Sequence, residues 1–186
     1  DCRHDKRIRK HMVFAAEIAT QHLEPLGSAS GYAEEIRPIL SSLALFEGFS
    51  ESECAAIFDY MACYGAASNT TILQEGDVGD FLIMVLTGRM DVLKADATGE
   101  SKVVAHILPG GILGEMSLID GQHRFATCLT REPTDFAVLS RQALNEILVD
   151  NPRLGNKLLL ILLQLMAQRL REATTRMLPT LVSDAI

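Results

Sequence analysis

One glutamate and one arginine stand close together in a stretch of this sequence that contains turn glycines. Glu115 follows Gly114 directly, and Arg124 comes nine residues after Glu115. Backbone N–H groups at a helix start attract an anion, because four of them lack partners within the helix and the helix dipole adds positive charge. Arginine offers phosphate a planar, permanently charged group, whereas a carboxylate accepts from a hydroxyl such as a ribose 2′-OH. The stretch predicts a site for a small ligand that carries a sugar hydroxyl and a phosphate.

The surrounding sequence predicts antiparallel strands. Short apolar runs are separated by glycine or charged turns, and the strands are expected over 71–74, 81–86, 89–94, 102–107, 126–129 and 135–140. Such even spacing is typical of a β-sandwich or barrel. The polar segment 96–100 is expected to form an exposed hairpin loop.

Helical periodicity flanks these strands on both sides. Helices are expected over 13–24, 33–45, 50–63 and 141–149. Residues 25–31, rich in glycine and serine, are expected to break the first two helices apart. Ser50 and Glu53 have the spacing of a capping box, in which each side chain satisfies a free backbone N–H at the start of the helix.

The composition is that of a folded globular chain. It has 186 residues, of which 48% are hydrophobic and 22% charged, enough for one domain with additional helices. A formal net charge of −7 argues against a nucleic-acid partner for this chain. The four cysteines form no Cys-x-x-Cys pair, so they are expected to be buried thiols in a reducing compartment. No apolar run approaches the length of a membrane helix. We therefore expect a cytoplasmic location and no membrane partner.

Two segments, in this order, resemble the cyclic nucleotide-binding domain family, which includes bacterial cAMP receptor proteins and the regulatory subunits of protein kinase A. Residues 73–88 resemble the family's apolar strand, its Glu-Gly-Asp-x-Gly-Asp turn, a second apolar strand and a glycine turn. Residues 114–118 (Gly-Glu-Met-Ser-Leu) and 124–127 (Arg-Phe-Ala-Thr) resemble its phosphate-binding cassette. The resemblance covers residues 43–178.

The resemblance implies a mainly β fold with flanking helices: an eight-stranded antiparallel jelly-roll barrel (a double-stranded β-helix) with N-terminal helices and a long C-terminal helix. It implies an N-terminal helical segment over 1–42, a cyclic nucleotide-binding β-barrel domain over 43–150, a dimerisation or lid helix over 151–178 and a tail over 179–186. The chain begins at Asp1 instead of methionine, and it is expected to be either a stand-alone module or a fragment of a longer protein.

The family's pattern also implies roles for individual residues. Glu115 would accept a hydrogen bond from the ribose 2′-OH, and Arg124 would pair with the cyclic phosphate. A polar residue late in the last helix, Thr174 or Thr175, would reach the purine. The ligand-binding residues implied in this way are Gly114, Glu115, Met116, Ser117, Arg124, Phe125, Ala126 and Thr174. The implied ligand is cAMP, with cGMP or a cyclic dinucleotide as alternatives.

Phe125 departs from the family's pattern, in which a small residue follows the arginine because it lies against the phosphate. The phenyl ring either points into the pocket and fills it, since a packed site tolerates little extra volume, or it faces elsewhere and leaves the amide available. Two functions follow. One is a sensor that couples nucleotide binding to rearrangement of the C-terminal helix, in signal transduction or transcriptional regulation. The other is a structural dimerisation module whose closed pocket binds nothing.

The last helix is expected to start with Asn151 as its cap and Pro152 in its first turn, and to run to Pro179. Its apolar face is wider than packing on one small barrel would bury, and residues 166–170 resemble the dimerisation helix of cAMP receptor proteins. We expect a homodimer with a parallel two-helix seam within residues 154–178; the alternative is that residues 13–45 fold back over this face.

The sequence gives no sign of catalysis. The five histidines are scattered, and no serine or cysteine has a visible base partner, so neither an enzyme nor a cofactor is expected. Glu75, Asp77 and Asp80 form a turn that could hold calcium, or one in which the carboxylates accept from nearby backbone N–H groups. No metal is expected. Gly79 and Gly88 are expected to supply backbone freedom at turns.

Overall fold

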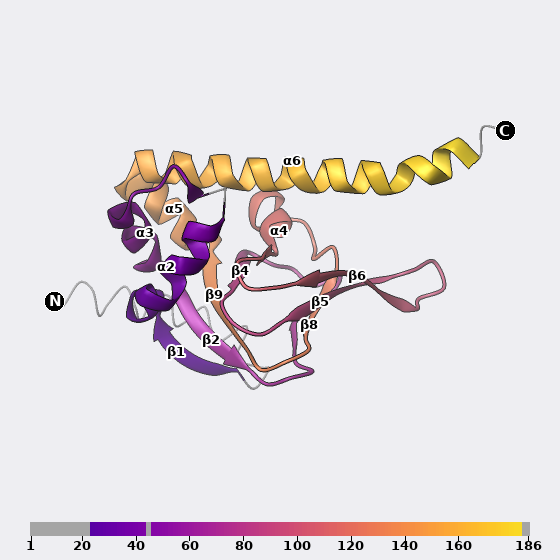
Figure 1. The fold of residues 1–186 in the computed structure, drawn as a ribbon, viewed down its shortest axis with the longest axis horizontal. Coiled ribbons are helices and arrows are strands. Elements are labelled where there is room, and N and C mark those ends of the chain that lie inside the picture. Colours follow the sequence, from indigo (N-terminus) through magenta and orange to yellow (C-terminus); the bar gives the residue numbers. More distant parts are fainter. Residues whose placement is uncertain (1–22, 44–45, 184–186) are drawn as a thin grey trace.

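The computed structural model describes residues 23–43 and 46–183, which form nine strands and six helices (Figure 1). The strands are β1 (Glu24–Ser28), β2 (Ala62–Ala66), β3 (Thr71–Leu73), β4 (Phe81–Val85), β5 (Met90–Ala95), β6 (Ser101–Ile107), β7 (Ile112–Leu113), β8 (Thr127–Thr130) and β9 (Thr134–Ser140). The helices are the 3₁₀ helix η2 (Ala29–Tyr32), α2 (Ala33–Ser42), α3 (Glu51–Phe58), α4 (Glu115–Asp120), α5 (Arg141–Asp150) and α6 (Pro152–Ser183).

The strands form two antiparallel sheets. The first has the order β1-β2-β9-β4-β7 and the second the order β3-β8-β5-β6. Across the described residues no ladder joins a strand of one sheet to a strand of the other, so the sheets do not close into a barrel; the prediction of antiparallel sheets with flanking helices is confirmed. The sheets are held together by side chains packed between their faces and not by pairing at their edges.

Strand β4 shows how the layers are built, because all five of its side chains are buried. Ile83 belongs to the core between the two sheets, where it packs with Phe136 and Met90. Leu82 and Met84 point to the opposite face and belong to the core beneath the helices. The first sheet is therefore covered on both faces, by the second sheet and by the helical layer.

The N-terminal part differs from the sequence prediction. Strand β1 lies where residues 25–31 were expected to be a break, and it pairs with β2, which begins inside the helix predicted over 50–63. The segment 1–42, expected to be helical, thus contributes a strand to the larger sheet. The capping box of Ser50 and Glu53 is confirmed, but α3 ends at Phe58 and leaves room for the turn into β2. The helix predicted over 13–24 lies almost entirely outside the described residues.

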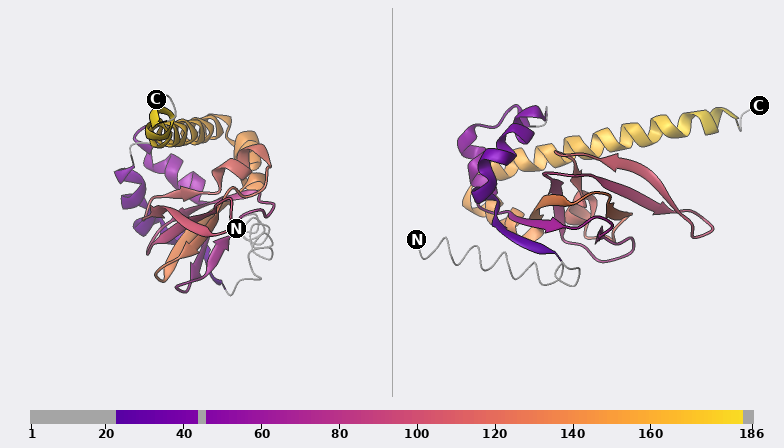
Figure 2. Two further views of the ribbon diagram at one scale, coloured as in Figure 1. Left: turned by 90° about the vertical axis from the view of Figure 1, so that its right-hand side faces the viewer. Right: turned by 60° about the horizontal axis from the view of Figure 1, so that its bottom comes forward.

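Helix α6 is the longest element, and at 1.5 Å per residue its 32 residues span about 48 Å. Figures 1 and 2 show it crossing above the helices and sheets and extending past them. Asn151 caps it as predicted, since its side chain accepts from the Leu154 N–H. The helix continues beyond Pro179, where its end was expected, because a proline inside a helix costs about 3 kcal/mol but does not forbid it. None of the described helices is long and apolar enough to cross a membrane.

Candidate functional site

The short helix α4 follows a glycine that no other residue could easily replace. Gly114 adopts φ +81°, in the left-handed region, and stands directly before Glu115 at the helix start. A Cβ at this position would also lie 2.5 Å from Arg124 Nη1 and 3.0 Å from the Phe81 carbonyl oxygen. Gly114 thus turns the chain from β7 into α4 and at the same time leaves space for the arginine.

Arg124 lies where the two signature segments of the sequence meet. Its backbone N–H donates to the Asp77 carbonyl at 2.7 Å, and its own carbonyl accepts from the Gly76 N–H at 2.9 Å. The guanidinium Nη1 donates to the Phe81 carbonyl (2.8 Å) and to the Gly114 carbonyl (3.0 Å). The guanidinium also lies over the Phe81 ring, 4.4 Å from its centroid.

One nitrogen of this guanidinium remains unpaired. Arg124 is only 5% exposed, and Nη2 is buried without a hydrogen-bond partner among the described residues. Burial lowers the pKa of Arg124, although nearby carboxylates such as Asp80 oppose the shift. Because an arginine stays charged in proteins, a buried donor of this kind favours an anion close to it.

Glu115 is the second buried charge of the site, with 1% of its surface exposed. Its nearest cation is Arg169 of α6, whose Nη1 lies 3.1 Å from Oε1, yet neither carboxylate oxygen has a hydrogen-bond partner of good geometry within the described part of the chain. Burial raises the pKa of Glu115, and Arg169 opposes part of this shift. A carboxylate with free acceptor positions inside a pocket can receive a ligand's hydroxyl.

Glu115 and Arg124 share one cavity of about 70 Å³. Its walls are Leu73, Val92, Leu113, Gly114, Glu115, Met116, Ser117, Arg124, Phe125, Ala126, Cys128 and Arg169. Seven of the eight site residues taken from the sequence are among these: Gly114 stands directly before α4, three residues belong to α4, and three lie in the segment between α4 and β8. Burial raises the pKa of the Cys128 thiol to about 12, so this part of the wall is uncharged.

Thr174 does not line this cavity. Its side chain is exposed, and its hydroxyl donates to the Leu170 carbonyl one turn earlier in α6. Arg169 is the α6 residue that reaches the cavity, and five residues along a helix rotate a side chain by about 140° away from that direction. Within one chain, Thr174 is therefore placed on a different face of α6 from the site.

Phe125 lies at the mouth of the cavity and not inside it. The residue is 60% exposed, and its ring lies against the Lys94 ammonium, whose Nζ is 4.3 Å from the ring centroid. Lys94 Nζ also donates to the Phe125 carbonyl at 2.7 Å and pairs with Glu75 at 2.5 Å. A ring that filled the pocket would be buried, so this arrangement favours the open alternative.

The calcium alternative has no support in the structure. The Glu75 carboxylate accepts from Lys94 and from the Ala95 N–H. Among the residues described, no group of three or more acidic, histidine or cysteine side chains could hold a metal ion. The turn instead holds the backbone of Arg124, which forms hydrogen bonds with the backbone of Gly76 and Asp77.

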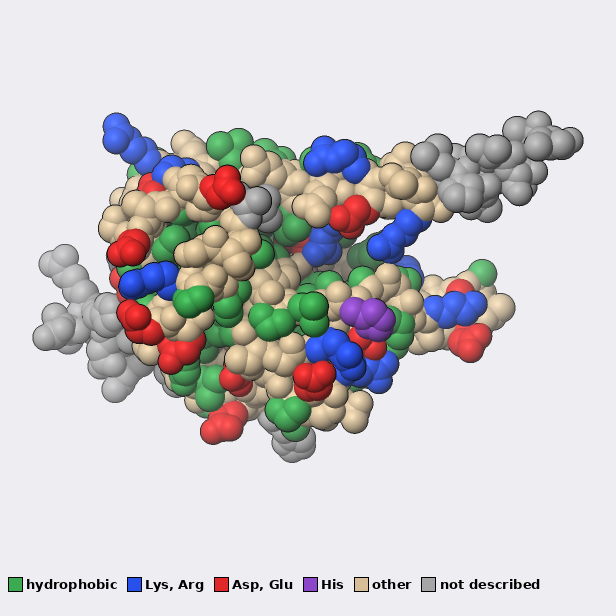
Figure 3. Space-filling model, viewed as in Figure 1, with side chains coloured by type: hydrophobic (Ala, Val, Ile, Leu, Met, Phe, Trp, Pro, Cys, Tyr) green, Lys and Arg blue, Asp and Glu red, His purple; other side chains and the backbone are tan. Residues whose placement is uncertain are grey.

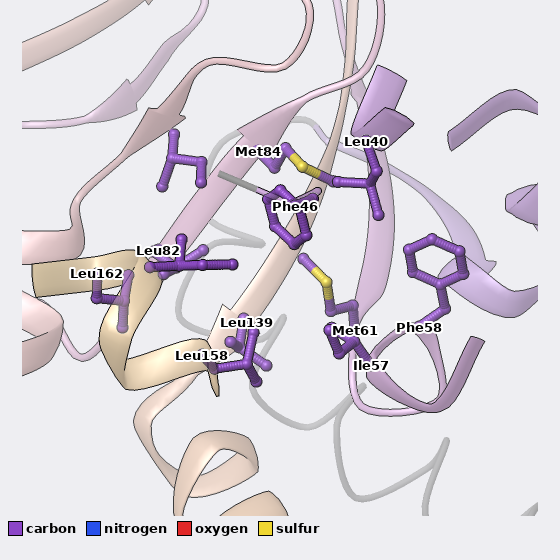
Figure 4. Close-up of a pocket in the computed structure, with 12 residues that line it drawn as sticks. Leu40, Phe46, Ile57, Phe58, Met61, Leu82, Met84, Leu139, Leu158 and Leu162 are labelled. Atoms are coloured by element: carbon purple, nitrogen blue, oxygen red, sulfur yellow. The ribbon is translucent and has the colours of Figure 1, made fainter. Parts of the chain in front are cut away.

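A second cavity lies between the larger sheet and the helical layer (Figure 4). It measures about 40 Å³, and its twelve lining side chains, among them Leu40, Met84 and Leu158, are all apolar. It offers neither a charge nor a hydrogen-bond donor, so a phosphorylated ligand would gain nothing there.

Arg169 is the residue of the site that sequence reasoning missed. It comes from α6, 54 residues after Glu115 in the sequence, and its Nη2 also donates to the Ile112 carbonyl of β7. The sequence offered no clear signal for it, because Arg169 lies between Gln168 and the charged residues Arg171 and Glu172, where an arginine is expected to be solvated.

Comparison with known proteins agrees with this geometry. A family model described as "Cyclic nucleotide-binding domain" matches residues 66–151. The crystal structure of a cyclic nucleotide-binding domain from Methylobacillus flagellatus KT has a TM-score of 0.78 and 46% identity, covering 85% of this chain and 89% of that one.

Two further relatives are more distant. The cyclic AMP receptor protein of Thermus thermophilus is 29% identical over 129 residues, 69% of this chain and 58% of that protein. The regulatory domain of Toxoplasma gondii PKA, whose structure was determined with cAMP, has a TM-score of 0.57 and 29% identity, covering 63% of this chain and 44% of that one. This chain thus spans under two thirds of the Thermus protein. Its similarity to the Methylobacillus domain extends over nearly the whole of both chains, and it belongs to the cyclic nucleotide-binding domain family.

Proposed function

We propose that this chain is a cyclic nucleotide sensor and that cAMP is its ligand. One observation carries the proposal: a carboxylate and a guanidinium, both at least 95% buried, line one cavity, and each has hydrogen-bonding atoms without a partner among the described residues. Leaving such groups unpaired is costly. A ligand that brings a hydroxyl to Glu115 and a phosphate to Arg124 would pair both at once.

Each residue then has a definite part in binding. Glu115 accepts from the ribose 2′-OH, and Arg124 Nη2 donates to an oxygen of the cyclic phosphate. Met116, Ser117 and Ala126 line the same cavity, and their backbone amides would provide further donors for that phosphate. Phe125 stays at the mouth with Lys94, where it leaves the space beside Arg124 free.

The choice of cAMP rests on the relatives, which include a cyclic AMP receptor protein and a PKA regulatory domain whose structure was determined with cAMP. A hydroxyl side chain one position before Thr127 would favour cGMP, but that position is Ala126. The hydroxyl of Thr127 itself accepts from the Glu75 N–H.

A comparison of cAMP with 2′-deoxy-cAMP tests this assignment. The deoxy ligand leaves Glu115 unpaired, so we expect its affinity to be lower by about tenfold or more, measured by isothermal titration calorimetry. In the Glu115→Leu variant, which has no acceptor for the 2′-OH, the two ligands should bind with similar affinity. Equal affinity of both ligands for the wild-type chain would show that Glu115 does not accept a hydrogen bond from the ribose 2′-OH.

Arg169 offers the route by which binding changes α6. It joins the Glu115 carboxylate to the helix and holds the Ile112 carbonyl with its other nitrogen. A ribose that donates to Glu115 alters the partner of Arg169 and so the packing of the helix. Because a ligand shifts an equilibrium only through contacts that differ between states, this shared carboxylate is the point where ligand and helix are coupled.

The outer face of α6 supports the homodimer. Leu160, Leu163 and Leu170 are 58%, 60% and 69% exposed, and with Ala167 they follow a spacing of three, four and three residues. This is the apolar repeat of a two-stranded coiled coil, and Figure 3 shows hydrophobic side chains along this edge of the helix. We infer a parallel seam with a second copy of the chain within residues 154–178.

The output of the sensor is assigned to a partner or to a segment outside this sequence. The chain spans 58% of the Thermus cyclic AMP receptor protein. Its relatives of this family are regulatory and not catalytic. A signalling or transcriptional role in the cytoplasm is the proposal most consistent with them.

A further inference from the structure

Gly79 occupies a place that its backbone conformation does not explain. The sequence suggested that Gly79 and Gly88 supply freedom at turns, and Gly88 does so with φ +72°. Gly79 is not among the glycines with positive φ, so any residue could adopt its conformation. The expectation for Gly79 is therefore wrong, and another reason for a glycine is needed.

The reason lies in the side chain of Arg124. A Cβ built on Gly79 would collide with Nε and Cζ of the guanidinium and lie 2.6 Å from Nη2. All three contacts are with this one group. Because Gly79 has only a hydrogen in place of a side chain, the space that a Cβ would fill is free for the guanidinium.

The other sides of the guanidinium are already occupied. Nη1 is held by the Phe81 and Gly114 carbonyls, and the Phe81 ring lies against the guanidinium plane. The Arg124 backbone is bonded to Gly76 and Asp77. If Gly79 gained a methyl group, the backbone of Arg124 would stay in place and its side chain would have to leave these partners.

We propose that Gly79 is a positioning residue for Arg124: its missing side chain leaves room for the guanidinium in the orientation that keeps Nη1 on the Phe81 and Gly114 carbonyls and Nη2 without a partner among the described residues. This inference rests on the proposed function, because it treats Arg124 as the phosphate ligand. It assigns to the Glu-Gly-Asp-x-Gly-Asp turn an indirect part in ligand recognition, through Arg124, in addition to its part in the fold.

The first test measures binding of cAMP by the full chain. Gly79→Ala should lower the affinity by about tenfold or more, because hydrogen bonds of a charged group are lost or misdirected. Gly31→Ala is the matched control: Gly31 has ordinary φ and no atom within 4 Å of an added Cβ, so its affinity should be unchanged. If Gly79→Ala binds cAMP as tightly as Gly31→Ala does, the proposal is wrong.

A second test needs no ligand and separates this inference from the proposed function. Thermal unfolding is measured for the wild type, Gly79→Ala, Arg124→Ala and the double variant. If the methyl group acts by displacing the guanidinium, Gly79→Ala should lower the melting temperature in the wild type but have little effect once Arg124 is alanine. An equal loss in both backgrounds would mean that Gly79 serves the turn alone.

Each test decides the inference about Gly79 when the other gives no result. If the wild type does not bind cAMP, the proposed function fails, and the unfolding comparison still decides whether Gly79 positions Arg124. If Arg124→Ala does not fold, the affinity of Gly79→Ala against Gly31→Ala decides it.

Discussion

The Nη1 atom of Arg169 lies 3.1 Å from Oε1 of Glu115 and thereby joins the long helix α6 to the short helix α4. The two residues differ sharply in exposure, since the side chain of Glu115 is 1% exposed and that of Arg169 is 37% exposed. The carboxylate bears most of the cost of burial, while the arginine can remain partly hydrated. The pair therefore links the buried carboxylate of the cavity to helix α6.

Replacing Glu115 with glutamine should stabilise the unliganded protein at neutral pH. Burial raises the pKa of Glu115 above its ordinary value of 4.5. At a pH between the two values the folded state holds a proton that the unfolded state has released, so the free energy of unfolding falls as pH rises. Glutamine removes this loss, and we expect a gain on the order of 1 kcal/mol, or ~2–4 °C in melting temperature.

Thermal unfolding from pH 4 to pH 8 checks this prediction. The advantage of Glu115→Gln over the wild type should be small at the acid end and grow toward neutral pH. A variant that is less stable than the wild type at neutral pH would show that Arg169 outweighs the burial of Glu115.

Arg169→Met should loosen α6 where it passes the site. The substitution removes the ion pair with Glu115 and the bond to the Ile112 carbonyl. We expect amide hydrogen exchange in residues 165–176 to become roughly fivefold faster, the effect of losing about 1 kcal/mol. Arg171→Met, an exposed arginine on the same helix, is the control and should leave exchange unchanged. Identical protection in both variants would show that Arg169 does not contribute to the packing of α6.

Charges placed on the outer face of α6 should separate the dimer. Leu163 and Leu170 are exposed in the single chain, and glutamate at both positions would put like charges into the apolar seam. Sedimentation analysis should show a dimer for the wild type and a monomer for the double variant. Gln164→Glu adds a charge at an exposed neighbouring position and should remain dimeric. A double variant that still dimerises would place the interface elsewhere.

Phe125→Ala should alter cAMP affinity by no more than about threefold, as for other exposed side chains. The ring is 60% exposed and contacts Lys94 at the mouth of the cavity. Calorimetry distinguishes this from the closed-pocket alternative, because a ring that filled the cavity would give a large gain in affinity when it is removed.

The sequence predicted the strands well where they are bounded by turn residues. The apolar runs over 81–86 and 135–140 appear as β4 and β9 with shifts of one residue at their ends. Strand β2 was missed because its residues are buried on both faces and directly follow a helix, so no change of period marks its start. Strand β7 has only two residues, too few for any periodicity.

The site was predictable to the extent that it is local in sequence. Gly114, Glu115 and Arg124 lie within one stretch, and the structure brings them to one cavity. The partnership of Glu115 with Arg169 depends on how α6 crosses the sheets, which local spacing does not determine. For the same reason Thr174 was placed at the site, although its face of α6 points elsewhere.

Calorimetric titration of the wild type and of Arg124→Ala with cAMP tests the central claim most directly, with circular dichroism to establish that both are folded. We predict saturable binding of one cAMP per wild-type chain and no measurable binding to the variant, because the buried guanidinium is the phosphate's main partner. A folded wild type that gives no heat, or an Arg124→Ala variant that binds as tightly as the wild type, would contradict the account.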